Sequence, residues 1–217
     1  PSSLDRTLGD VLSATRPGSA GSAVVRSEWS HLVDVLPSSP DLQTLEVLSR
    51  GFDGLLLGSK PETRLRRGLR GVSDGYAAVL VDCPPSLGSL TTNGLAAATK
   101  GLIVVEPTAL GLRGVEPVAD LIDDVWHHHN QWLDVAGVVV NRMPARSHDA
   151  QVRLEELSRS VGARSVWSPP IPHRVVVAEA AADRRPIHHT GARGRVVAEV
   201  FDDLYARLWR KIRPRRR

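Results

Sequence analysis

The chain has 217 residues, of which 41% are hydrophobic and 24% charged, so it is long and apolar enough to form a folded core, and wholesale disorder is excluded. No apolar run approaches the roughly 20 residues of a membrane span. The one cysteine, Cys83, excludes an internal disulfide and any paired-cysteine metal or redox site, and it favours a reducing, cytoplasmic setting.

The first 75 residues give weak signals for secondary structure. Apolar spacing predicts a short helix over residues 4–14, and residues 32–36 have the composition of a strand. Asp41 is placed to cap a helix over about 41–49. Residues 61–72 predict another helix, with its proline near the first turn.

From residue 76 the pattern becomes regular. The apolar runs 76–81, 102–105 and 135–140 predict parallel strands that are buried on both faces. Strands that alternate with amphipathic helices favour an α/β fold, with a mostly parallel sheet flanked by helices on both faces. The intervening helices and one further short strand are expected at 89–99, 113–129, 148–161, 195–211 and 165–167. We expect a single domain over 1–212 and a basic tail over 213–217.

The formal net charge of +4 is unevenly distributed. One arginine cluster lies between residues 184 and 195, and six of the last eight residues are basic. These clusters favour a polyanionic partner, DNA before membrane, although a solvated basic face that binds nothing specific has the same composition.

Asp82 directly follows the apolar run 76–81. In open α/β sheets, ligands bind beyond the carboxyl ends of the strands, and a carboxylate there suits Mg²⁺, which prefers hard oxygen ligands. Two prolines then stiffen the chain, and Gly88 permits close backbone approach. A lone aspartate at a strand end can equally be a turn former or a helix cap.

The segment DCPPSLG at 82–88, continued by LTTNGLAAA at 90–98, closely resembles the Walker B and switch II region of ParA/Soj-type partition ATPases, a deviant Walker P-loop family related to MinD. Further similarities cover most of the chain. They comprise LGDVL at 8–12, the strand and turn at 102–108, Leu112-Arg113-Gly114, Asn141, the "IP…V…EA" segment at 171–180 and Pro186-Ile187.

The resemblance implies a P-loop NTPase-like fold that uses ATP and Mg²⁺. Asp82 would be the catalytic carboxylate that holds Mg²⁺ through water, and the segment that follows it would sense the γ-phosphate. Asn141 would contact the nucleotide base, and Pro172 would pack against it. The cofactor-binding residues implied in this way are Pro84, Pro85, Gly88, Asn141 and Pro172.

For partners, the resemblance implies an ATP-dependent homodimer that binds nucleoid DNA without sequence specificity and is stimulated by a centromere-binding, ParB-like protein. Arg174, Arg193 and Arg195 stand where DNA contacts are expected, and such contacts to phosphate are steeply salt-dependent. The expected location is therefore cytoplasmic and nucleoid-associated, with no membrane partner.

The sequence departs from the family in one respect. A P-loop needs G-x-x-x-x-G-K-[ST], and none of Lys60, Lys100 and Lys211 has this context. The chain also begins without Met, so we expect it to be N-terminally incomplete and to bind ATP weakly or not at all. It would be either a truncated ATPase or a natural relative without a P-loop. ATP hydrolysis is thus implied by resemblance alone.

Two alternative functions stay open: a non-catalytic adaptor for DNA or protein, and a MinD-like membrane-associated positioning ATPase. Other candidate sites are weaker. Adjacent residues His127, His128 and His129 cannot all face one metal and are expected to form a polar helix end. No G-x-S-x-G elbow supports Ser86 as a nucleophile, and Cys83 is expected to be a small buried side chain.

Overall fold

The computed structural model describes residues 6–14, 16–40, 42 and 61–213. The chain forms two compact units, each described by itself below. Unit 1 comprises Pro1–Thr99 with Leu121–Leu133, and unit 2 comprises Lys100–Asp120 with Asp134–Arg217. Apart from Leu42, the helix predicted over 41–49 lies outside the described residues, as do the last four residues of the predicted basic tail.

Unit 1 is built mainly from short helices around a small core. Its helix α1 starts at a capping box, in which the Thr7 amide donates to the Asp10 carboxylate. Val11 and Leu12 of that helix are buried in two apolar clusters, the second of which includes Leu65. The elements are α1 Leu8–Ser13, η1 Ser19–Ser22, β1 Val25–Arg26, β2 Asp34–Val35, η2 Pro61–Thr63, α3 Arg64–Leu69, η3 Ser73–Gly75 and α4 Ser89–Ala97, and β1 pairs with β2 in antiparallel fashion.

Two buried asparagines fix helix α4 within unit 1. Asn93 accepts hydrogen bonds from the Arg64 and Leu65 amides and donates to the carbonyls of Pro61 and Ser89, so it joins α4 to the start of α3. Asn130 donates to two carbonyls near the C-terminal end of α4. These side chains satisfy backbone groups that a helix end leaves without partners.

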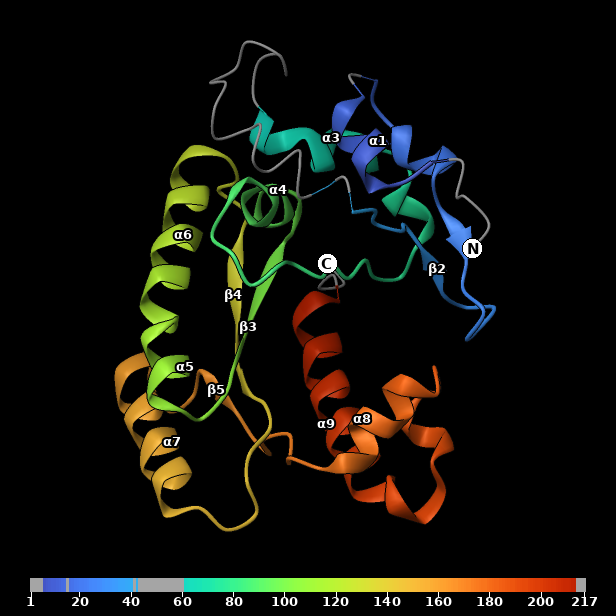
Figure 1. The fold of residues 1–217 in the computed structure, drawn as a ribbon. Coiled ribbons are helices and arrows are strands. Elements are labelled where there is room, and N and C mark those ends of the chain that lie inside the picture. Colours follow the sequence, from blue (N-terminus) through green and yellow to red (C-terminus); the bar gives the residue numbers. More distant parts are fainter. Residues whose placement is uncertain (1–5, 15, 41, 43–60, 214–217) are drawn as a thin grey trace. The chain divides into compact units, whose positions relative to one another are not determined.

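Unit 2 contains a parallel sheet in the order β3–β4–β5 (Figure 1). Six residue pairs join β3 to β4, and two join β4 to β5. The elements are β3 Lys100–Val105, α5 Ala109–Arg113, β4 Asp134–Val140, α7 His148–Val161, β5 Val166–Trp167, α8 Val175–Ala182, η4 Ile187–His189, η5 Gly191–Arg193 and α9 Arg195–Ile212, while α6 Val115–His128 is divided between the units.

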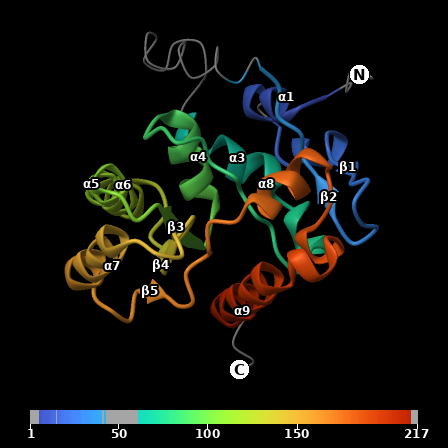
Figure 2. The same ribbon diagram turned by 60° about the horizontal axis from the view of Figure 1, so that its bottom comes forward.

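Helices pack on both faces of this sheet, although Leu102 and Val104 of β3 are exposed. On one face, Val138 and Val140 of β4 pack with Ala150 and Leu157 of α7. On the other face, residues of β4 and β5 pack with Leu204 of α9 and its apolar neighbours. Both ribbon views show α7 and α9 on opposite sides of the strands (Figures 1 and 2). The predicted α/β class, with a parallel sheet between helical layers, is confirmed.

Gly137 lies at an irregularity in β4 that allows a large side chain to be buried beside it. Gly101 pairs with Val135 but Leu102 pairs with Gly137, so the ladder skips one residue of β4. Gly137 has a φ of 153°, and a Cβ at this position would overlap the indole of Trp167. The Trp167 ring is 2% exposed and donates from Nε1 to the Ala136 carbonyl at 3.2 Å.

The strand predicted over residues 76–81 is wrong. The segment has no strand assignment, no described strand pairs with it, and its large apolar side chains are exposed, with 77% of Leu80 accessible. An apolar run indicates a tendency toward burial, but a strand also requires a neighbouring backbone for its hydrogen bonds. That partner is lacking among the described residues.

We predict that Gly137→Ala lowers the free energy of unfolding by about 2–4 kcal/mol, because the methyl group meets the indole and the backbone angle disfavours a side chain. Gly75→Ala is the control: it has a negative φ and no other heavy atom within 4 Å, so a change within about 0.5 kcal/mol is expected. Urea titration followed by tryptophan fluorescence measures both. Equal stability of the two variants would contradict the packing described.

A second prediction concerns the ion pair between Lys100 and Asp134 at the start of β3 and β4. The lysine hydrogen bond holds the pKa of the Asp134 carboxyl below its ordinary value. A lowered pKa contributes stability above the unfolded-state pKa of about 3.9, and this is lost as the pH falls through the folded-state value.

Asp134→Asn should therefore cost about 0.2–1 kcal/mol at pH 7, a small value because the carboxylate is largely exposed. The difference from the wild type should shrink on acidification below pH about 4. Unfolding midpoints measured across pH would test this, with Asp203→Asn as the comparison, because Asp203 is exposed and forms no ion pair with any described residue. A pH-independent difference would rule out the ion pair as its source.

Candidate functional site

The segment 82–88 leads directly into helix α4 of unit 1. Asp82 is exposed, and Gly88 is the N-cap residue of α4. The segment is held against the helix by the Thr91 hydroxyl, which donates to the Ser86 carbonyl at 2.6 Å, and by the Thr92 hydroxyl, which donates to the Gly88 carbonyl at 3.2 Å. The two threonines thus fix the distal half of the segment, while the Asp82 carboxylate faces solvent.

Close contact with Gly94 brings the proximal half of the segment onto the same helix. A Cβ on Gly94 would lie 2.7 Å from Cys83 Sγ and 3.3 Å from a Val81 methyl carbon, so any larger residue would have to displace the Cys83 side chain. Burial, and then the charge of Asp82, raise the pKa of the Cys83 thiol. The thiol therefore stays protonated at neutral pH, and the oxygens of Asp82 are left as the hard ligand at this position.

In unit 2, Asn141 and Pro172 come together at the carboxyl end of β4. The Ile171 amide donates to the Val140 carbonyl, and the Met143 amide to the Ile171 carbonyl, both at 2.8 Å. Met143 and Pro172 form a parallel bridge. Two residues that are 31 positions apart in sequence are thus held on adjacent backbones at one edge of the sheet.

The Asn141 side chain is oriented by its own loop. Its Oδ1 accepts a hydrogen bond from the Arg142 amide at 2.9 Å, which leaves the Nδ2 group to donate elsewhere. Arg142 adopts a left-handed backbone with a φ of 54°, and its guanidinium pairs with Glu106 at 3.1 Å. That ion pair ties the exit of β4 to the exit of β3. This ion pair was not predicted from the sequence, although the polar residues that follow the two apolar runs were the available signal.

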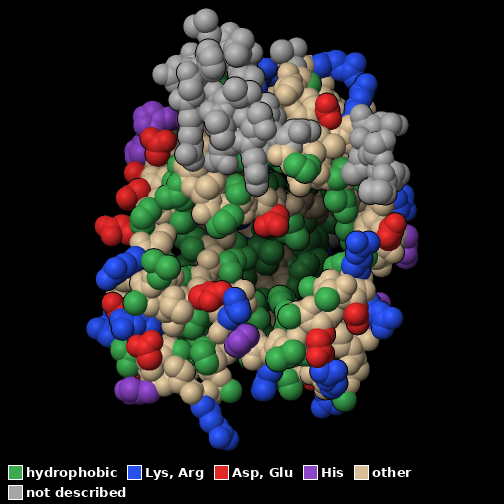
Figure 3. All heavy atoms as spheres, viewed as in Figure 1, with side chains coloured by type: hydrophobic (Ala, Val, Ile, Leu, Met, Phe, Trp, Pro, Cys, Tyr) green, Lys and Arg blue, Asp and Glu red, His purple; other side chains and the backbone are tan. Residues whose placement is uncertain are grey.

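The three arginines predicted to contact DNA all belong to unit 2. Arg174 is the N-cap residue of α8 and forms no ion pair with the described residues. Arg193, in contrast, pairs with Glu179 at 2.7 Å, and Arg195 pairs with Glu199 at 3.3 Å. On the face shown in Figure 3, acidic and basic side chains are interspersed rather than separated.

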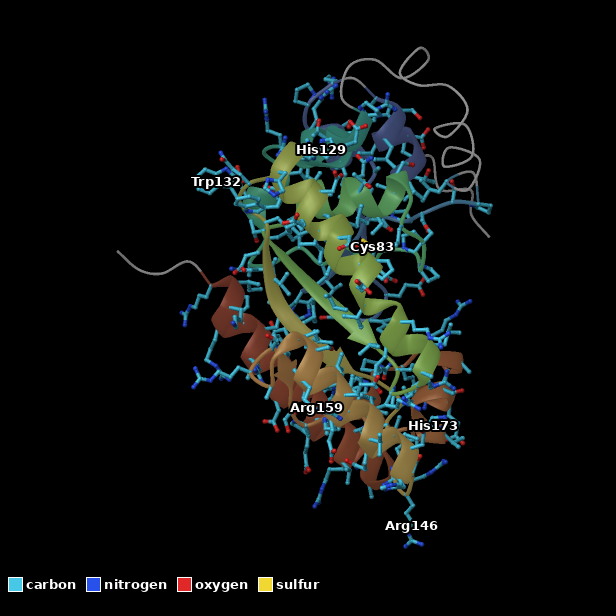
Figure 4. The ribbon with its side chains drawn as sticks, turned by 90° about the vertical axis from the view of Figure 1, so that its left-hand side faces the viewer. Cys83, His129, Trp132, Arg146, Arg159 and His173 are labelled. Carbon is cyan, nitrogen blue, oxygen red and sulfur yellow. The ribbon has the colours of Figure 1, made fainter. Side chains whose placement is uncertain are left out.

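Other basic and metal-binding candidates occupy separate positions. Arg146 lies in the loop before α7, and its side chain extends away from the body of the protein (Figure 4). His127 and His128 pair with Asp123 and Asp124 along α6. Within the described ranges, no three histidine, cysteine or carboxylate side chains gather closely enough to hold a metal, and no helix there has the length and apolar character needed to span a bilayer.

Comparisons with known proteins agree with the motif at 82–88. A family model described as an AAA domain matches residues 2–135. The sporulation initiation inhibitor protein Soj of Bacillus subtilis is 30% identical over 181 residues, which cover 83% of this chain and 68% of Soj. The chain belongs to the ParA/Soj-type partition ATPase family. It spans between 43% and 68% of the lengths of the curated relatives it matches.

Solved structures support the same fold. A cobyrinic acid a,c-diamide synthase from Mycobacterium smegmatis, crystallised with an ATP analogue and magnesium, is 26% identical and superimposes with a TM-score of 0.73 over 98% of this chain and 76% of that one. The apo form of McdA from Cyanothece gives a TM-score of 0.76 at 17% identity, covering 96% of this chain and 79% of McdA. The ParA-like chain thus has the α/β fold of P-loop ATPases.

We predict that Asn93→Ala destabilises the protein by about 1–3 kcal/mol, since it leaves buried amide and carbonyl groups at the α3–α4 junction without partners. Asn141→Ala removes the same side chain from a half-exposed loop and should cost less. Thermal unfolding of both variants is the measurement. If Asn141→Ala proved the more damaging, the structural role assigned to Asn93 would be wrong.

Proposed function

We propose that the protein is an ATPase for chromosome or plasmid segregation, which binds Mg²⁺-ATP, dimerises and then binds DNA without sequence specificity. The observation that carries this proposal is the DCPPSLG segment, with an exposed carboxylate at its first position and its end fixed at the N-terminus of α4. Membership of the ParA/Soj-type family supports the class of activity.

Asp82 is proposed to hold Mg²⁺ through water. The residues present fit this role, because Mg²⁺ in nucleotide sites commonly takes one or two carboxylates together with substrate phosphates and water. When bound, the ion would neutralise charge that develops on the phosphates. Pro84, Pro85 and Gly88 would form the segment that responds to the γ-phosphate, with the hydroxyls of Thr91 and Thr92 anchoring it to α4.

Asn141 and Pro172 are proposed to bind the base. They lie side by side at the carboxyl end of β4, where ligands of open α/β sheets bind. With Oδ1 occupied by the Arg142 amide, Asn141 would donate from Nδ2 to an acceptor on the purine edge, while the flat ring of Pro172 packs on its face. Asn141 would thus orient the nucleotide without taking part in the chemistry.

Arg174, Arg193 and Arg195 are proposed to contact DNA phosphates in the ATP-bound homodimer, and a ParB-like protein is the proposed stimulating partner. The protein would then be associated with the nucleoid in the cytoplasm. Residues 1–217 contain no G-x-x-x-x-G-K-[ST] sequence, so we propose that these residues alone bind ATP weakly.

We predict that Asp82→Asn in the complete gene product lowers Mg²⁺-dependent ATP hydrolysis at least about 10-fold, since losing a positioned charge costs more than about 1.4 kcal/mol of transition-state stabilisation. Asp74→Asn makes the same charge change at an exposed turn of unit 1 and should leave the rate unchanged. Phosphate release with and without Mg²⁺ measures both. Equal rates for the two variants, or a complete gene product without ATPase activity, would favour a non-catalytic adaptor instead.

A further inference from the structure

The basic surface of unit 2 carries its own counter-charges. Helix α8, the turns η4 and η5 and helix α9 together present two arginines and a histidine that each contact a carboxylate. The pairs are Arg193 with Glu179, Arg195 with Glu199, and His188 with Asp202 at 2.9 Å. Of the three arginines assigned to DNA, Arg174 alone has no carboxylate partner among the described residues.

The pair between Glu179 and Arg193 spans a longer stretch of chain than the pair between Arg195 and Glu199. Arg195 and Glu199 are neighbours on one helix, whereas Glu179 lies on α8 and Arg193 lies 14 residues later in η5. The bond between Arg193 Nη2 and Glu179 Oε2 is 2.7 Å long, the length of a charge-assisted hydrogen bond. The Arg193 side chain is nevertheless 70% exposed, so a DNA phosphate can reach it.

We propose that Glu179 competes with DNA phosphate for Arg193 and thereby sets the affinity of the protein for DNA below what its arginines could supply. This rests on the proposed DNA-binding function and adds to it a residue that weakens binding. Glu179 occupies one N–H group of the Arg193 guanidinium and offsets its charge, so a phosphate contact at Arg193 releases fewer counterions than contact with a free arginine would. Arg174, which has no carboxylate partner among the described residues, then binds DNA phosphate without this competition, whereas Arg193 binds it less strongly.

The size of the effect follows from the exposure of the pair. An exposed ion pair contributes about 0.2–1 kcal/mol, which corresponds to an increase of at most about fivefold in DNA affinity when the carboxylate is neutralised. The salt dependence gives a sharper measure. Each additional free cation that contacts phosphate steepens the slope of log K against log salt by up to about 0.9.

The experiment compares Glu179→Gln with Glu155→Gln in the complete gene product with ATP. Both changes remove one negative charge, but Glu155 on α7 is exposed and forms no ion pair with any described residue. Binding to a short fluorescent DNA duplex of mixed sequence is followed by anisotropy between roughly 50 and 200 mM salt. The double variant Glu179→Gln with Arg193→Gln has the net charge of the wild type. Thermal unfolding confirms that each variant is folded.

We expect Glu179→Gln to bind DNA about two- to fivefold more tightly, with a steeper salt slope. The double variant should return to near the wild-type affinity, and Glu155→Gln should change the affinity less and leave the slope unchanged. Equal effects of Glu179→Gln and Glu155→Gln, with DNA binding intact, would overturn this inference but leave the proposed function standing. Failure of the wild type and every variant to bind DNA would overturn the DNA-binding function and this inference together.

Discussion

The parallel pairing of β3 with β4 is the interaction on which unit 2 depends. Because β4 is hydrogen-bonded on both edges and its last five residues are buried, its register fixes where the following loop emerges. The ion pair between Glu106 and Arg142 then joins the exits of the two strands, and backbone bonds attach Pro172 to the same edge. The placement of Asn141 therefore follows from strand register, and its orientation follows from one local hydrogen bond to the next amide.

The sequence predicted the elements whose stability comes from regular apolar burial. Helix α7 was predicted with its observed limits, 148–161, and the structure shows Ser147 as its N-cap and Gly162 directly after its end. The helix predicted at 113–129 corresponds to α6, and the short helix α5 before it was not predicted. Helix α8 was not predicted, since its run of three valines disfavours a helix and its tertiary contacts decide the outcome. The run at 76–81 shows the converse: its composition is that of a strand, but pairing needs a neighbour that sequence periodicity does not reveal.

The candidate site could be predicted only in part, because motifs identify residues but do not reveal contacts between distant side chains. Motifs placed Asn141 and Pro172 at the same site, and the fold brings them together because one follows a strand and the other lies on the segment that extends the sheet. The partner of Arg193 was not predictable from charge clustering. Glu179 lies 14 residues earlier, and only the turn after α8 brings the two side chains into contact. Counting arginines thus overestimates the positive charge available to a polyanion.

A short stretch of chain connects the two binding activities proposed here. Pro172 is held by the backbone bonds on either side of it, to Val140 at the end of β4 and to Met143 in the loop that follows, and Arg174, two residues later, is the N-cap of α8. Glu179 lies one and a half turns further along that helix and holds Arg193. A shift of Pro172 on nucleotide binding would therefore move the start of α8. That movement would carry with it both Arg174 and Glu179, the carboxylate that pairs with Arg193. Coupling through one short helix requires no change in the sheet, whose buried face on β4 resists gradual deformation.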